Sequence, residues 1–306
     1  MNTQSNAMTG PSIQSQGTPA AVPAAHAMYW SVRRELWENR SIYIAPMAAA
    51  AVFLFGFAIN MVTVRHRIGA SLLDPAQPHN LLATRYELSA ALIMGTALIV
   101  GIFYSLDALY GERRDRSILF WKSLPVSDLT TVLSKLTIPI VILPLLSFVI
   151  SLATQFIMLL LSSVILLGSG VNIAALWTEV SFFPVSLVLL YHLLTVHGLW
   201  YAPFYGWLLL VSAWAPRAPF LWAVLPPFVI CGVEKIAFNT SYFLALLQER
   251  LMGSGDAMGP NGAPKDFMAT LIPEHFFDRP GLWIGLALAA VFLAGAVRLR
   301  RYQGPI

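Results

Sequence analysis

The sequence predicts an all-α membrane protein, a bundle of about six transmembrane helices with both termini in the cytoplasm. Of its 306 residues, 57% are hydrophobic and only 11% are charged. Soluble domains are roughly 45–50% apolar and about 25% charged, so this chain has too few charges to cover a soluble surface. The net charge of +4 fits the basic loops of a membrane protein, and no nucleic-acid partner is expected.

The first part of the chain changes character at about residue 27. Residues 1–27 combine Ser, Gln, Pro, Ala and Gly without an apolar period, which predicts a disordered cytoplasmic tail and no secretory signal. Residues 28–306 are expected to form one transmembrane domain. Within them, residues 29–40 predict an amphipathic helix in the membrane interface, with a polar lead-in to the first span as the alternative. Its apolar side would hold Tyr29, Trp30, Val32, Leu36 and Trp37, and its polar side Ser31, Arg34, Glu35 and Glu38.

Six apolar runs are long enough to cross a hydrocarbon core of about 30 Å, which takes about 20 helical residues. They are residues 42–62, 88–110, 136–167, 182–214, 220–242 and 282–297. The third run is longer than one crossing needs and should tilt or project. The fourth is also too long, and Pro203 with Gly206 offers it a place to bend. Two short segments in place of either run are the alternative.

The basic residues indicate which side of the membrane each loop faces. With six spans and both ends inside, twelve of the 19 Lys and Arg residues are cytoplasmic, which leaves seven outside or within a span. The opposite orientation would break the positive-inside rule. The twelve are Arg33, Arg34, Arg40, Arg113, Arg114, Arg116, Lys122, Lys135, Arg217, Arg298, Arg300 and Arg301.

A segment of about 40 residues, 241–280, separates the last two runs and is expected outside. Residues 243–252 predict a short amphipathic helix, and residues 253–264 a flexible loop. Aromatic residues in the remainder indicate that it dips back toward the membrane surface.

The most informative segment is 107–135, DALYGERRDRSILFWKSLPVSDLTTVLSK. Gly111 would break the helix that leaves the second span, and Ser117 would cap a short helix over residues 118–122, which Pro125 ends. Ser127 and Asp128 would cap the helix that enters the third span. Leu119, Phe120 and Trp121 are costly to leave in water, which predicts docking into another protein's groove or, alternatively, contact with the membrane interface.

From Tyr29 onward the chain resembles the type-2 class of permeases of ATP-binding cassette (ABC) transporters. The resemblance rests on RRELWENRSIYIAP, on YGERRDRSILFWKSLPVSDLTTVLSK and on LWIGLALAAVFLAGAVRLRRY. It implies that the loop 111–127 forms a coupling helix in a cleft of an ATPase subunit, with Glu112 and Arg116 as polar contacts. The implied ATPase contact consists of Glu112, Arg113, Arg114, Asp115, Arg116, Ser117, Ile118, Leu119, Phe120, Trp121 and Lys122. The external segment 241–280 also matches the family in position, although the hydrophilic loop 253–264 departs from its compact form.

This resemblance implies an exporter subunit in the inner (plasma) membrane that works with two ATPase copies and with a second permease copy or a paralogue. An amphipathic or lipid-like substrate would move outward through the lipid-embedded dimer. The chain contains no GxxxxGK[ST], HExxH or GxSxG motif, and its single cysteine, Cys231, excludes an internal disulfide. We therefore expect no enzyme activity and no cofactor in this chain, with ATP and Mg²⁺ bound by the partner ATPase.

Three polar residues within the apolar runs are candidates for a transport path: Glu234, His192 and His197. Ionisable groups inside a membrane are functional candidates by default, although Glu234 lies near the outer edge of its run, where it would anchor the helix. The two histidines are five apart, about 140° around an α-helix, and are poorly placed to share a metal. The competing functions are an ion-coupled carrier using Glu234 and His192, and an intramembrane haem or metal enzyme around the histidines.

Overall fold

The structure, a computed structural model, describes residues 24–70, 77–124, 126–167, 177, 182–252 and 276–306. Every regular element within these ranges is helical, as the composition predicts. The elements are α1 (Ala24–Glu38), α2 (Ser41–Ala70), α3 (Gln77–Asp107), α4 (Tyr110–Arg114), α5 (Ile118–Ser123), α6 (Asp128–Thr137), the π-helix η1 (Ile138–Ile142), α7 (Leu143–Ile165), α9 (Phe182–His192), the π-helix η2 (Leu193–Trp200), α10 (Ala202–Trp214), α11 (Pro219–Phe238), α12 (Tyr242–Met252), the 3-10 helix η4 (Phe276–Asp278) and α14 (Pro280–Tyr302).

Five segments of the described chain are long and apolar enough to cross a membrane, and a bent pair makes a sixth if it forms one span. The five are Ser41–Thr63, Arg85–Arg114, Asp128–Ile165, Pro219–Phe238 and Pro280–Tyr302; the pair is Ser186–Trp200 with Ala202–Trp214. The predicted multi-pass helical class is therefore confirmed, with five or six spans. The side of the membrane that each loop faces stays a prediction.

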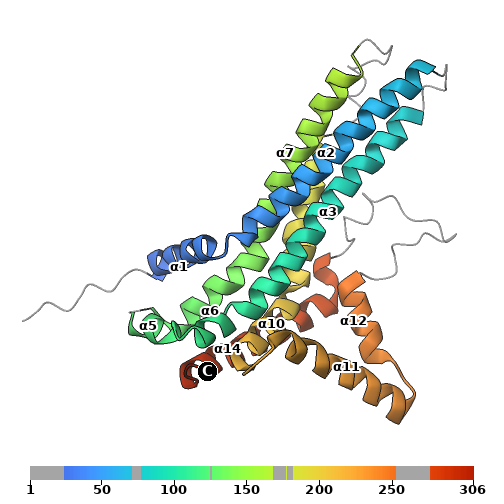
Figure 1. The fold of residues 1–306 in the computed structure, drawn as a ribbon. Coiled ribbons are helices and arrows are strands. Elements are labelled where there is room, and N and C mark those ends of the chain that lie inside the picture. Colours follow the sequence, from blue (N-terminus) through green and yellow to red (C-terminus); the bar gives the residue numbers. More distant parts are fainter. Residues whose placement is uncertain (1–23, 71–76, 125, 168–176, 178–181, 253–275) are drawn as a thin grey trace, which may run out of the picture.

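The long helices α2, α3 and α7 run side by side, and α10 packs along α14 (Figure 1). Figure 1 also shows α1, α5, the start of α6 and the C-terminus together at one end of the bundle, which we call the loop end. A core cluster near this end contains Ile42, Val132, Leu209 and Ala296, all almost fully buried. These residues belong to four different helices, so one apolar core joins α2, α6, α10 and α14.

The third predicted run forms one continuous segment of 38 residues, through α6, η1 and α7. Its π-helical turn contains Pro139, and Pro144 follows at the start of α7. Proline has no N–H for an i→i−4 bond, so a change of helical winding at these positions has a clear cause. The other π-helix packs against this one: a Cβ on Gly198 would lie 3.0 Å from the carbonyl oxygen of Ile140. Glycine is what allows the two segments to approach this closely.

The fourth predicted run is broken, as the sequence indicates, by a bend of 46° between Trp200 and Ala202. Pro203 lies in the first turn after the break, where proline fits a new helix start. Gly206 has a different role from the one expected. A Cβ there would lie 3.3 Å from the carbonyl oxygen of Ala289, so this glycine lets α10 pack closely on α14.

The N-terminal helix α1 corrects two expectations. It begins at Ala24, so residues 24–27 are helical rather than disordered, while the rest of the predicted tail lies outside the described residues. The expected division into an apolar and a polar side is also wrong. Glu35 is buried, beside Val32 and Leu36 on the packed side, while Trp30 and Trp37 are exposed. The reason is that α1 packs on α6, where a buried lysine, Lys135, receives the Glu35 carboxylate.

Helices α11 and α12 form a hairpin that stands out from the bundle (Figure 1). Helix α11 ends earlier than the predicted run, because Asn239 adopts a left-handed C-cap conformation (φ 51°). Helix α12 agrees with the helix predicted for residues 243–252. The predicted flexible loop 253–264 lies outside the described residues.

Candidate functional site

The loop between the second and third spans consists of two short helices at the loop end. Helix α3 ends at Asp107, before Gly111, which instead lies inside α4 beside the Asp107 carboxylate. The turn between α4 and α5 places Arg116 in the left-handed region, with φ 58°. Ser117 precedes α5 as predicted, but its hydroxyl donates to the carbonyl of Glu112 at 3.4 Å and does not cap the helix. The next cap is confirmed: Ser127 Oγ accepts from Thr130 N at 3.0 Å.

Helix α5 presents apolar side chains to the outside. Leu119 and Phe120 are 59% and 60% exposed, whereas Ile118 is buried. Trp121 packs edge-on against Phe120 and lies under the Arg34 guanidinium, 3.8 Å from the ring centroid. The predicted apolar group is therefore divided: two side chains face outward, and the indole fastens α5 to α1.

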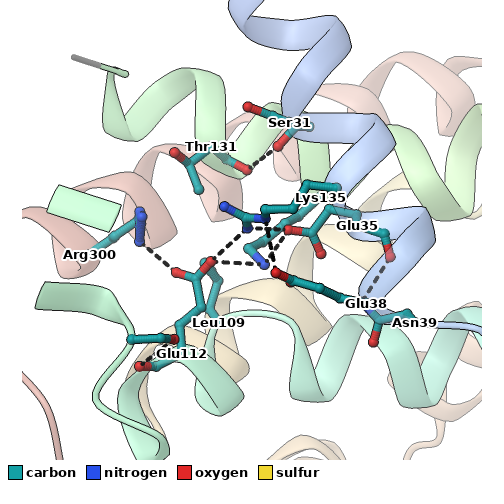
Figure 2. A network of polar contacts seen from close by, with 12 residues as sticks. Ser31, Glu35, Glu38, Asn39, Leu109, Glu112, Thr131, Lys135 and Arg300 are labelled. Carbon is teal, nitrogen blue, oxygen red and sulfur yellow. Dashed lines mark hydrogen bonds and ion pairs between the residues drawn. The ribbon is translucent and has the colours of Figure 1, made fainter. Parts of the chain in front are cut away.

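Two buried carboxylates anchor this loop, one from α1 and one from α4 (Figure 2). Glu35 accepts from Lys135 Nζ at 2.9 Å, from an Arg34 nitrogen at 2.6 Å and from the Tyr104 hydroxyl at 2.9 Å. These contacts join α1 to α3 and α6. Without these contacts the Glu35 carboxylate, which is 1% exposed, would be desolvated without a compensating hydrogen bond or ion pair.

The second carboxylate belongs to the loop itself. Glu112 lies within 3.2 Å of three cations: Arg34 at 3.2 Å, Lys135 at 3.1 Å and Arg300 at 2.9 Å. Arg300 also reaches Asp128 at 3.3 Å, and Arg34 also pairs with Glu38 at 3.5 Å on the exposed edge of the group. We call Arg34, Glu35, Glu112, Asp128, Lys135 and Arg300 the ion network. Figure 2 shows Glu112 between Arg300 on one side and Lys135 on the other.

The electrostatics of the ion network follow from burial and pairing. Burial raises the pKa of Glu35, but the charges of Lys135 and Arg34 outweigh that effect and hold it below the ordinary value. Burial likewise lowers the pKa of Arg34, yet Glu35 and Glu38 raise it overall. Both groups are therefore charged at neutral pH. Desolvation of such pairs is costly, so the ion network is better evidence of a specific geometry than of large net stability.

Backbone contacts fix the start of the loop to α10. The Ser212 hydroxyl accepts from the amides of Leu109 and Tyr110 at 3.0 and 2.9 Å. Arg113 donates to the carbonyls of Ala213 at 2.6 Å and Ala215 at 3.2 Å. The loop is thus tied to α10 as well as to α1, α6 and α14.

These positions change the interpretation of the predicted contact set. Glu112, Arg113 and Ile118 are buried within this chain, so they hold the loop and are not on its exposed surface. Lys122 donates to the carbonyls of Arg301 and Gln303 at the end of α14. The exposed side chains of the set are those of Arg114, Asp115, Arg116, Leu119, Phe120 and Lys122.

Sequence reasoning missed Glu35, Lys135 and Arg300 as members of one cluster. Glu35 and Lys135 are 100 residues apart, and Arg300 lies 188 residues after its partner Glu112. The sequence feature that could have identified them is their position relative to the membrane: each charged residue lies at the loop end of a different helix, next to an apolar run. Charges at matching depth on neighbouring helices are the pattern expected of an ion network.

The structure does not gather the predicted transport-path residues into one site. Glu234 caps helix α12: its carboxylate accepts from the amides of Tyr242 at 2.6 Å and Phe243 at 2.9 Å, and from the Thr240 hydroxyl at 3.0 Å. This is the anchoring role that was its alternative interpretation.

The two histidines lie on either side of the α9–η2 boundary. His197 is buried as predicted, but its Nε2 has no hydrogen-bond partner among the described residues. The π-helical winding of η2 also changes the angle calculated for an α-helix, since i→i+5 bonding brings residues five apart closer to one side. Within the described chain no cluster of three His, Cys, Asp or Glu side chains suits a metal ion.

Comparisons with protein-family models, with curated proteins and with solved structures found no match for this chain.

Proposed function

We propose that this chain is the permease subunit of an ATP-driven exporter of the ABC type, with helix α5 as the contact for a separate ATPase. The observation that carries the proposal is the division of the loop into an exposed apolar tip and a buried charged base. Leu119 and Phe120 project outward, while Glu112 beneath them is held by three cations. Exposed apolar side chains rimmed by polar ones are typical of protein-binding surfaces.

The base of the loop supports a coupling role. Glu112 contacts side chains of α1, α6 and α14, and Arg113 contacts the backbone of α10. Because these are short, buried contacts, a push on α5 would move several helices together and would not be absorbed by a flexible loop. A partner that changes conformation on ATP binding would thereby alter how the spans pack.

The remaining parts of the proposal follow from the resemblance. Two ATPase copies, bound to ATP and Mg²⁺, would act on two permease copies in the inner (plasma) membrane, with α5 on the cytoplasmic side. The substrate would be amphipathic or lipid-like and would move outward between the two bundles. Glu234 supports a carrier mechanism poorly, since its oxygens are occupied by the backbone of α12.

The test is co-purification of a separate ATPase subunit with this chain. We expect Leu119→Ala with Phe120→Ala to reduce ATPase capture at least tenfold, because apolar hot-spot residues typically cost about 2 kcal/mol or more on truncation. The melting temperature in detergent should stay unchanged, since both side chains are exposed. Phe220→Ala, another exposed aromatic that is 53% accessible, is the matched control and should leave capture intact.

Two results would contradict the proposal. One is undiminished capture of the ATPase by the double variant. The other is ATP hydrolysis by the purified chain alone, which its lack of a phosphate-binding motif does not allow.

A further inference from the structure

Helix α1 carries a stripe of aromatic and basic side chains on the face turned away from the bundle. Tyr29, Trp30 and Trp37 are 57%, 54% and 71% exposed, and Arg33 and Arg40 are exposed as well. The spacing of three or four residues places Trp30, Arg33 and Trp37 along one side of α1, with Tyr29 one turn before Arg33, and Arg40 follows the end of the helix. The opposite side is buried on α6 through Val32, Glu35 and Leu36, so the stripe takes no part in the packing of the bundle.

Arg33 is held between two indoles. Its guanidinium carbon lies 5.0 Å from the ring centroid of Trp30 and 5.1 Å from that of Trp37. Within the described chain the structure gives Arg33 no ion pair, in contrast to its neighbour Arg34. A guanidinium in cation–π contact with indole rings keeps N–H donors that match two oxygens of a phosphate.

The position of α1 indicates what covers this stripe. Helix α1 ends at Glu38 and the span that begins α2 starts at Ser41, so the stripe lies at the entry to the membrane. Figure 1 shows α1 lying at an angle to the long axis of α2, and not continuing it. Trp and Tyr prefer the headgroup region of a bilayer, and basic residues there are attracted to anionic lipids. An exposed aromatic stripe with two exposed arginines has this complementary chemistry.

We propose that the outer face of α1 binds anionic phospholipid headgroups, with the phosphate received by Arg33 between Trp30 and Trp37. Arg40 supplies a second positive charge at the start of the span. The site is independent of the proposed ATPase, because it uses the face of α1 opposite to the one that contacts the loop.

The experiment uses the full chain in detergent with added phosphatidylglycerol or phosphatidylcholine of identical acyl chains. Native mass spectrometry counts the retained lipids, and the melting temperature reports stabilisation. We expect the wild type to prefer phosphatidylglycerol, and Arg33→Gln to lower its apparent affinity about fivefold, which corresponds to ~1 kcal/mol per basic residue. Trp30→Ala with Trp37→Ala should have a similar effect. Arg217→Gln, which removes an exposed arginine outside the stripe, should keep the preference.

Three outcomes would overturn the proposal. They are equal retention of both lipids by the wild type, an unchanged preference in Arg33→Gln, and equal stabilisation by inorganic phosphate, which would identify a free anion as the ligand. If Arg33→Gln melts early in phosphatidylcholine, Arg33→Lys replaces it. Lysine keeps the charge of arginine but lacks its planar fork, so Arg33→Lys should show a preference for phosphatidylglycerol that is weaker than that of wild type or Arg217→Gln but is not lost completely. Full wild-type affinity in Arg33→Lys would exclude a site that depends on the guanidinium.

Discussion

Charged side chains beside apolar helices have different kinds of partner at the loop end and in the α11–α12 hairpin. At the loop end, Glu35, Glu112 and Lys135 are buried and paired with side chains from five helices, α1, α3, α4, α6 and α14. In the hairpin, Glu234 is satisfied by backbone amides only a few residues away. Only 6% of the residues in the apolar stretch of the α11 span are buried, compared with 39% for the span that contains α3. Long-range ion pairs fix tertiary geometry, whereas a local cap fixes only one turn.

This difference predicts where the molecule is rigid. A displacement of α5 reaches α1, α6 and α14 directly through Glu112. The end of α12 is held by its last two turns: Arg250 lies 4.2 Å from the ring centroid of Trp200 and donates to the Gly281 carbonyl at 3.2 Å, and the Leu251 carbonyl accepts from the Tyr201 hydroxyl at 3.0 Å. Trp200 returns a hydrogen bond to the Arg250 carbonyl at 3.0 Å. The hairpin should therefore separate from the bundle more easily than the loop does.

The largest effect is expected from Lys135→Met. This change removes the cation between Glu35 and Glu112 and leaves Arg34 as the only cation that contacts both buried carboxylates, a loss that costs up to about 3–5 kcal/mol. The melting temperature of the detergent-solubilised chain measures it. Lys122→Met is the control, because Lys122 is exposed and should contribute less than about 1 kcal/mol. Equal melting of the two variants would mean that the ion network does not hold the loop end.

The second prediction concerns the attachment of α12. A Cβ on Gly285 would occupy the position of the Arg250 guanidinium, so Gly285→Ala should displace it from Trp200 at a cost of about 1–3 kcal/mol. Gly281→Ala, one turn earlier, meets only Trp200 at 3.7 Å and should be tolerated. Adding Arg250→Ala to Gly285→Ala should cost less than the sum of the single changes. Strict additivity would contradict the contact.

Removal of the α12 cap should have a smaller effect. Glu234→Ala leaves the amides of Tyr242 and Phe243 without their acceptor, so the first turn of α12 should open more easily. Faster hydrogen exchange confined to the first turn of α12 is the expected signature. Glu249→Ala, an exposed carboxylate later in α12, should leave that exchange unchanged. A general loss of transport with unaltered exchange would instead favour the carrier mechanism.

The smallest effect is expected from pH, because a protonated Glu35 can still accept the Tyr104 hydrogen bond. Since folding lowers the pKa of Glu35 below 4.5, the folded state binds this proton less readily than the unfolded state. The stability contributed by Glu35 is therefore present above about pH 4.5 and is lost as pH falls through the lower, folded value. Glu35→Gln should reduce the dependence of the melting temperature on pH in this acidic range. The same slope in both proteins would exclude this contribution.

The sequence by itself determined the class of the protein and the place of its loop. Long apolar runs leave only helices as a solution for backbone hydrogen bonding in lipid, so helix number and approximate bounds follow from composition. Pro203 marked the bend of the fourth run, and Ser127 marked the start of α6, because both act on their own turn of helix. These features depend on neighbours within a few residues.

Only the tertiary structure decided which charges meet. Glu112 was predicted to be a surface contact, because two of the three cations that pair with it lie outside segment 107–135. Its partners Arg34 and Arg300 are 78 and 188 residues away. Glu35 likewise belonged to the polar side of an isolated α1 and became buried when α1 packed on α6. Ion pairing acts through space and needs the helices in place, so helical periodicity alone assigns such a residue to the wrong side.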